Sequence, residues 1–187
     1  IFDGDSVDAG EGGGLDIPDF SLDLRISNDS VEYWYNLVYN ERNTFFTADE
    51  NIVNASYPNN LVTTTATNGE NQMWKFVGSE KEGFTIINKL GYAIYVEEDK
   101  FGNFVKYCKV ENLAGISKFY VNQSFGNQYW ISTENHSIDD YDSSIPCYRN
   151  VLYEKLNANA IIKFIPLFDK GDDSATPQPE APLVVTG

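Results

Sequence analysis

The sequence predicts an all-β domain made of three similar repeats, and three observations lead to this. Short runs rich in aromatic and β-branched residues alternate with clusters of Ser, Asn, Gly and Asp, which is the pattern of strands joined by turns. Periodicity of the helical kind is weak along the whole chain. The strand signals also recur with a fixed period, and such a repeat favours a closed, symmetric barrel over a sandwich.

The strand signals lie between residues 30 and 168. Each is a short run of mostly large apolar or β-branched side chains, bounded by residues that are typical of turns. With 187 residues, the chain is long enough for one sizeable core and too short for two ordinary domains. The clearest expected strands are Tyr35–Tyr39, Phe84–Ile87, Tyr92–Val96, Phe119–Val121 and Ile161–Phe164.

Three segments begin in the same way. Each opens with an aromatic residue and a strand, continues through a polar turn and enters a second strand. The three segments start at Tyr35, Phe84 and Tyr129, which lie 45 to 49 residues apart. A period of this length predicts one supersecondary unit repeated three times.

Each repeat also ends on an alternating strand, at residues 72–76, 117–121 and 160–164. The third and fifth residues of each segment are large and apolar, and on a strand they point to the same side. One repeat cannot bury this side alone, so we expect the three repeats to share one core. The six side chains expected in it are Trp74, Phe76, Phe119, Val121, Ile162 and Phe164.

One of these segments carries a recognisable motif. Residues 68–76 read Asn-Gly-Glu-Asn-Gln-Met-Trp-Lys-Phe, which resembles the Asn-Gly-x-x-Asn-Gln-x-Trp signature of ricin-type β-trefoil lectins and carbohydrate-binding modules. Residues 84–96 resemble the strand and hairpin that open the family's next repeat. The resemblance covers about residues 33–168 and implies a β-trefoil. It also implies that Trp74 is a core residue and that Gln72 bonds to backbone within its own repeat.

The family resemblance implies a sugar site in the third repeat. There Asp139 takes the family's Asp position, with Asp140 as the alternative if the register shifts by one residue. Tyr153 takes the position of the aromatic platform, and Asn159 that of the Asn before the Gln-x-Trp motif. Such a set suits sugars, because the carboxylate accepts from hydroxyl groups, the ring contacts the C–H face, and the amide both donates and accepts.

The other two repeats depart from the family pattern. In the second repeat Tyr107 takes the platform position, but Tyr95 stands where the family has Asp. The first repeat keeps Asn71 but has Thr47 at the Asp position and no aromatic residue near Thr64. We therefore expect a platform without its carboxylate in repeat two, and no site of the family's kind in repeat one.

Acidic residues concentrate at the two ends of the chain. The formal net charge is −15, of which residues 1–24 contribute −7 and residues 169–187 contribute −3. We expect residues 1–29 to form an acidic, Gly-rich, extended leader and residues 30–168 to form the β-trefoil. Residues 169–187 are expected to form a Pro-rich linker that leads to a further domain.

Charge and motifs argue against several classes of function. Nucleic-acid binding needs clustered Lys and Arg, and no apolar run is long enough to insert into a membrane. There is no Gly-x-Ser-x-Gly motif, and the single histidine, His136, lies in a polar stretch. The spacing of Cys108 and Cys147 fits neither a redox pair nor a zinc site, and leaves open two thiols or one disulfide. We expect no catalytic activity, no metal and no cofactor.

The sequence therefore predicts a non-catalytic, lectin-like module of a secreted or cell-surface protein, with a glycan or polysaccharide as its partner. Weak binding would be strengthened by multivalency or by a tethered catalytic domain. A structural or protein-interaction module without sugar binding is the alternative, because a fold does not decide a function. An exposed apolar patch on a long loop would favour that alternative, and residues 51–67 are the candidate loop.

Overall fold

The computed structural model describes residues 23–99, 102–134, 136–141, 148–154 and 160–169. The side chains of residues 98–103, 140–141 and 148–154 are outside this description. The described residues form twelve β-strands and two short 3₁₀ turns, and no longer helix is found among them. None of the described helices has the length and hydropathy needed to cross a membrane.

The first repeat contains four strands, one more than the opening and closing motifs indicate. Its last strand follows a short turn that holds the Asn-Gln pair of the signature motif. Asn68 before this turn has a φ of 58°, a left-handed conformation that Asn tolerates better than most residues. The elements are β1 (Tyr35–Tyr39), β2 (Thr44–Thr47), β3 (Val62–Thr64), the 3₁₀ turn η1 (Glu70–Gln72) and β4 (Trp74–Ser79).

The second and third repeats have the same order of strands. In the second, the middle hairpin is long and is followed by a 3₁₀ turn. Its elements are β5 (Gly83–Asn88), β6 (Tyr92–Asp99), β7 (Gly102–Lys109), η2 (Val110–Asn112) and β8 (Tyr120–Phe125). The third repeat consists of β9 (Gln128–Ser132), β10 (His136–Tyr141), β11 (Tyr148–Glu154) and β12 (Ile162–Pro166).

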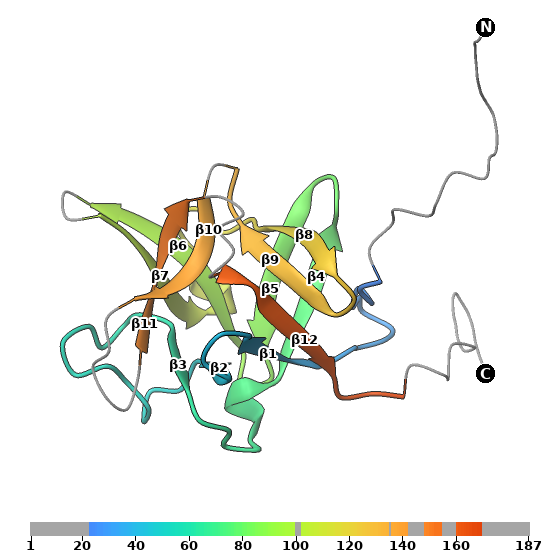
Figure 1. Ribbon diagram of the computed structural model, residues 1–187, viewed down its shortest axis with the longest axis horizontal. Coiled ribbons are helices and arrows are strands. Elements are labelled where there is room, and N and C mark those ends of the chain that lie inside the picture. The colour runs from blue at the N-terminus through green and yellow to red at the C-terminus, as the bar shows by residue number, and fades with distance from the viewer. Residues whose placement is uncertain (1–22, 100–101, 135, 142–147, 155–159, 170–187) are drawn as a thin grey trace, which may run out of the picture.

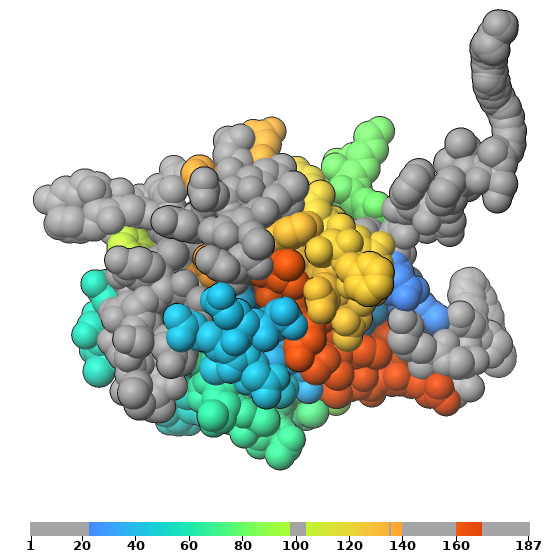
Figure 2. All heavy atoms as spheres, in the orientation of Figure 1, coloured from blue at the N-terminus to red at the C-terminus, as the bar shows by residue number. Residues whose placement is uncertain are grey.

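The first and last strands of each repeat form a closed barrel. Around it the order is β1, β4, β5, β8, β9 and β12, and antiparallel pairing of β12 with β1 completes the circle. Between β5 and β8 the contact is the bridge of Phe84 with Phe119. In the space-filling view, the yellow segment of β8 and β9 lies beside the orange-red segment of β12 (Figure 2).

The middle strands of each repeat form three hairpins, β2–β3, β6–β7 and β10–β11. They lie at one end of the barrel, where β11 pairs with both β3 and β7 (Figure 1). Strands that are far apart in the sequence therefore lie side by side at this end of the barrel. The cap formed by these hairpins brings side chains of different repeats together, which is where ligand sites can form.

The six side chains predicted for the shared core are all there. Each is at most 8 % exposed, and all belong to one buried cluster. Aromatic rings pack closely within this cluster: the centroid of the Phe164 ring lies 5.1 Å from that of Phe76, which belongs to the first repeat, and 4.3 Å from that of Tyr129, which belongs to its own repeat. The prediction of a threefold core is thus confirmed, and its apolar burial provides the main stabilisation of the fold.

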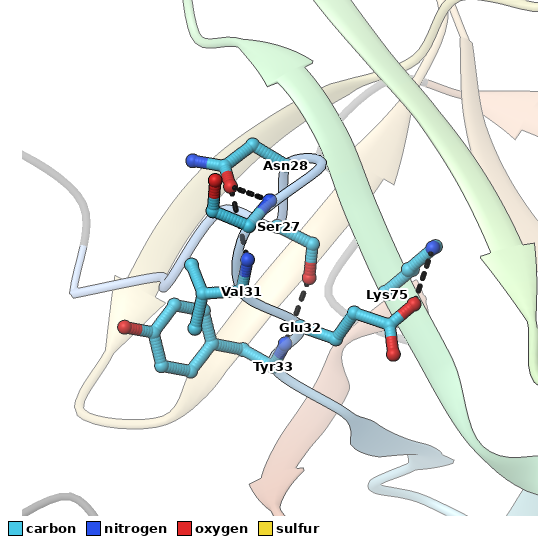
Figure 3. Close-up of polar contacts among 7 residues, drawn as sticks. Ser27, Asn28, Val31, Glu32, Tyr33 and Lys75 are labelled. Atoms are coloured by element: carbon cyan, nitrogen blue, oxygen red, sulfur yellow. Dashed lines mark hydrogen bonds and ion pairs between the residues drawn. The ribbon is translucent and has the colours of Figure 1, made fainter. Parts of the chain in front are cut away.

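Residues 23–29, expected as part of the leader, lie against the barrel. Leu24 is buried in the core cluster, and Ser27 forms a parallel bridge with Val77. The backbone N–H of Ser27 donates to the oxygen of Phe76 at 2.8 Å, and its hydroxyl accepts from the N–H of Tyr33 at 2.8 Å (Figure 3). The described part of this segment therefore belongs to the folded domain.

Candidate functional site

The signature motif of repeat one has a structural role. The side-chain amide of Gln72 donates to the hydroxyl of Thr47 and to the oxygen of Thr65, both at 2.9 Å, and its oxygen accepts from the N–H of Thr67 at 2.8 Å. Trp74 is fully buried and donates from Nε1 to the oxygen of Phe46 at 3.0 Å. Both roles agree with what the resemblance implied.

The predicted third-repeat site is described only in part. Asp139 lies on β10, is 8 % exposed and stands opposite Val151 of β11. Tyr153 is paired with Ser137, two positions along the same hairpin. Asn159 and the side chains of Tyr153 and Asp140 lie outside the described residues, as do Cys147 and residues 170–187. This sugar site therefore stays a prediction.

The predicted platform of repeat two, Tyr107, lies in an open groove. Its volume is about 370 Å³, and it runs between the hairpin β6–β7 and the long loop that follows β2. We call it the Tyr107 groove. It is lined by Glu50, Val53, Pro58, Asn59, Tyr92, Tyr107, Cys108 and Lys109.

The loop of repeat one forms the groove by attaching itself to the hairpin of repeat two. The N–H of Leu61 donates to the oxygen of Val105 at 2.8 Å, and the N–H of Tyr107 donates to the oxygen of Asn59 at 3.4 Å. Farther along, the rings of Tyr57 and Phe104 stack with their centroids 6.0 Å apart. The groove is therefore a junction between two repeats and has a well-supported wall on each side.

Two tyrosines provide the aromatic surface of the groove. The rings of Tyr92 and Tyr107 meet edge to face, with centroids 5.1 Å apart. The hydroxyl of Tyr92 donates to Oε2 of Glu50 at 2.8 Å. Burial and the neighbouring Glu50 carboxylate raise the pKa of Tyr92 to about 12, and burial raises the pKa of Tyr107. Both phenols are therefore protonated, and act as donors, at neutral pH.

The charged side chains that line the groove balance one another. Glu50 supplies one carboxylate, and Lys109 supplies one ammonium group, 4.4 Å from the centre of the Tyr92 ring. Asn59 adds an exposed amide that can both donate and accept. An aromatic face with hydrogen-bonding groups and no net charge suits a neutral, hydroxyl-rich ligand.

Asp49, next to Glu50, is held by the framework. Its Oδ2 accepts from the amide of Asn71 at 2.9 Å, and its Oδ1 accepts from the N–H of Asn51 at 2.9 Å. These two bonds lower the pKa of Asp49. Asn71, which the family places at a sugar site, here fixes the loop that carries Glu50.

The buried residue Asn88 holds the backbone of Tyr92 in place. This side chain is 1 % exposed; its amide donates to the oxygens of Ala48 and Asn71, and its oxygen accepts from the N–H groups of Leu90 and Tyr92. It thereby connects the end of β5 to the start of the loop in repeat one. A buried residue thus determines how the two walls of the groove meet.

No protein-family model matches the chain, and no curated protein matches it. Several solved structures do match the chain. The chain aligns with the BEL beta-trefoil at a TM-score of 0.56 and 11 % identity, over 76 % of this chain and 97 % of that one. The fold of this chain is a β-trefoil. At such low identity the likeness concerns the fold alone.

Two further β-trefoil matches come from sugar-related proteins. A Macrolepiota procera ricin B-like lectin, solved in complex with lactose, matches at a TM-score of 0.54 and 12 % identity, over 71 % of this chain and 94 % of that one. An exo-β-1,3-galactanase from Clostridium thermocellum matches at 0.56 and 17 % identity, over 75 % of this chain but only 31 % of that protein.

Within the β-trefoil, the register explains why repeat two lacks the family's pair. Tyr107 stands opposite Ile94, while Tyr95 stands opposite Lys106, so Tyr95 and Tyr107 belong to opposite faces of the hairpin. The polar partners of Tyr107 come from Lys109 on its own face and from the loop of repeat one. None of Tyr92, Glu50, Asn59 and Lys109 was predicted as a site residue. Glu50 and Asn59 reach the groove through the packing of two repeats, and Lys109 lies beside Tyr92 because the two are paired across the hairpin.

Metal binding and thiol chemistry have little support among the described residues. No group of three or more His, Cys, Asp or Glu side chains is placed there to hold a metal ion. Cys108 at the groove is a free, half-buried thiol, and burial raises its pKa, which disfavours the reactive thiolate.

Proposed function

We propose that this β-trefoil is a non-catalytic, lectin-like carbohydrate-binding module, and that the Tyr107 groove binds a neutral glycan. The observation that carries the proposal is the combination of a tyrosine surface with a carboxylate, an ammonium group and an amide in one open groove. Neutral sugars present an apolar C–H face and a rim of hydroxyl groups, and the groove offers a partner for each.

In this proposal the ring of Tyr107 contacts the C–H face of a sugar. Glu50 accepts from hydroxyl groups through the oxygen that Tyr92 leaves unused, and Lys109 and Asn59 donate. One shallow contact of this kind gives about 4–6 kcal/mol of binding, which corresponds to roughly high-micromolar to millimolar affinity. Retention on a glycan surface would then depend on several sites acting together.

The lining of the groove also supports a role without catalysis. Glycoside hydrolysis ordinarily uses two carboxyl groups on either side of the scissile bond. Of the described residues that line the Tyr107 groove, Glu50 is the only carboxylate. The lactose-bound lectin supports sugar binding, and the galactanase, about a third of which matches this chain, supports an accessory domain tethered to a catalytic one. We propose the same setting here, in a secreted or cell-surface protein.

A protein-interaction module is the second candidate. It is favoured by Phe125, which lies at the turn between β8 and β9 and is 80 % exposed. A side chain so large and apolar is often part of an interface. The long loop after β2, which the sequence suggested for this role, instead packs on the hairpin β6–β7.

An array of immobilised glycans tests the two candidates. The domain would be presented as a streptavidin-bound tetramer so that millimolar binding is detected. We expect retention on a subset of neutral glycans, reversed by the same free sugar at millimolar concentration. A blank array, with the domain shown to be folded by its circular dichroism, would contradict the glycan-binding proposal and favour a protein partner.

A further inference from the structure

A second groove lies on the outer wall of the barrel. It has a volume of about 410 Å³ and shares none of its lining residues with the Tyr107 groove. We call it the Trp34 groove. It is lined by Glu32, Trp34, Lys75, Ile87, Asn88, Lys89, Gly91 and Val110.

The barrel register places Trp34 and Lys75 on the same outer surface. Tyr35 and Trp74 are paired across β1 and β4, and both are buried in the core. Because side chains alternate along a strand, Trp34 and Lys75, which flank this pair, point away from the core. Ile87 stands opposite Lys75 on β5 and extends the same surface.

Two ammonium groups lie near the indole ring. Nζ of Lys75 is 5.3 Å and Nζ of Lys89 is 5.5 Å from the centre of the Trp34 ring. Lys75 also forms an ion pair with Glu32, with Nζ and Oε2 2.9 Å apart (Figure 3). Among the described residues no carboxylate pairs with Lys89, so the groove has one positive charge in excess.

The segment before β1 fixes Glu32 in this position. The side-chain oxygen of Asn28 accepts from the N–H groups of Ser30 and Val31, at 2.7 and 3.1 Å, and closes a tight turn (Figure 3). The hydroxyl of Ser27 then accepts from the N–H of Tyr33. Glu32 is therefore held where it neutralises Lys75, and Lys89 is left to meet an incoming anion.

We propose that the Trp34 groove binds an anionic sugar unit, whose carboxylate or sulfate ester pairs with Lys89 while its ring contacts Trp34. Trp34 and Val110 provide apolar surface for the ring, and the excess charge selects the anionic group. The Tyr107 groove has no such excess charge, so the two sites differ in the ligand that they take. This inference goes beyond the neutral glycan proposed for the Tyr107 groove.

The net charge of the whole chain bears on how an anion can bind to it. A formal net charge of −15 repels anions at long range, so general attraction cannot account for anion binding here. One unpaired ammonium group beside an aromatic ring suits a single charged sugar. An extended polyanion such as a nucleic acid would need many more basic groups.

Tryptophan fluorescence of the full chain tests the proposal, because Trp34 is one of three tryptophans and lines the groove. The probes are a trimer of galacturonic acid, a neutral trimer of galactose and a monosulfated trisaccharide. We expect at least one of the two anionic probes to change the emission at low salt, and Lys89→Met to weaken that binding about tenfold. Whichever anionic probe binds identifies the anionic group.

Lys81→Met is the matched control, because Lys81 is exposed in the turn between β4 and β5 and the substitution removes the same charge outside the groove. This variant should bind the anionic probe like the wild type. The proposal is overturned if neither anionic probe binds, if Lys89→Met binds normally, or if Lys81→Met loses as much binding as Lys89→Met. A failure to bind neutral glycans, with anionic binding intact, would contradict the function proposed for the Tyr107 groove and would leave the proposal for the Trp34 groove standing.

Discussion

The hydroxyl of Tyr107 donates a 3.2 Å hydrogen bond to the main-chain oxygen of Asp49, and this bond joins the second repeat to the first. Tyr107 lies on the hairpin β6–β7, whereas Asp49 begins the long loop after β2. A residue that the sequence marks as a sugar platform thus also fixes the opposite wall of its own groove. The candidate site belongs to neither repeat alone.

Asn88→Ala should destabilise the domain and disturb the groove together. The substitution removes the hydrogen-bond partner of the buried N–H of Tyr92 and of the buried oxygen of Ala48, and also that of the N–H of Leu90. We expect a loss of about 2–5 kcal/mol in the free energy of unfolding, measured by urea titration. Asn112→Ala, at an exposed position in η2, should change it by less than about 0.5 kcal/mol. Equal effects of the two substitutions would contradict the role given to Asn88.

Stability should fall in alkaline solution, in part because of Tyr92. The pKa of this phenol rises from 10.0 to about 12 in the folded protein, so the folded state holds the proton more tightly than the unfolded state. Its contribution is therefore complete below pH 10 and is lost as the pH rises from 10 to about 12. Urea midpoints at pH 9, 10 and 11 should fall less steeply for Tyr92→Phe than for the wild type. Parallel decreases would show that Tyr92 does not contribute.

The third-repeat site can be tested apart from the Tyr107 groove. If Asp139 and Tyr153 bind sugar, Asp139→Asn and Tyr153→Ala should each lower the avidity of the tetramer for its glycan by about tenfold, because one class of site is lost. Asp29→Asn, an exposed acid before β1, should have no effect. Normal binding by both site variants, with normal melting temperatures, would rule out this site.

The fold could be predicted from the sequence because a threefold core repeats its pattern. The openings at Tyr35, Phe84 and Tyr129 and the alternating ends of the repeats each specify which side of a strand is buried. One intact signature, Gln72-x-Trp74, then indicated the family, although Phe119 and Ile162 replace the tryptophan in the other repeats. All of these positions depend on local spacing, which a sequence displays directly.

The candidate groove could be predicted only in part. Tyr107 was found because the family has an aromatic residue at that position. Glu50 and Asn59 come from a loop more than 45 residues away in the chain, and nothing in its composition shows that it packs on the hairpin β6–β7. Lys109 belongs to the groove because it stands opposite Tyr92 in the register of the hairpin β6–β7. The contacts of Glu50 and Asn59 follow from tertiary packing rather than from spacing.

The most direct test of the account compares Tyr107→Ala with Tyr95→Ala. Both tyrosines are half-buried on the hairpin β6–β7, but they belong to opposite faces. Each variant would be titrated, as a tetramer, against the neutral glycan that the wild type retains best, after circular dichroism has shown it to be folded. We expect Tyr107→Ala to weaken binding at least tenfold and Tyr95→Ala to bind like the wild type. Unchanged binding by Tyr107→Ala, or an equal loss in both variants, would contradict the proposal for the Tyr107 groove.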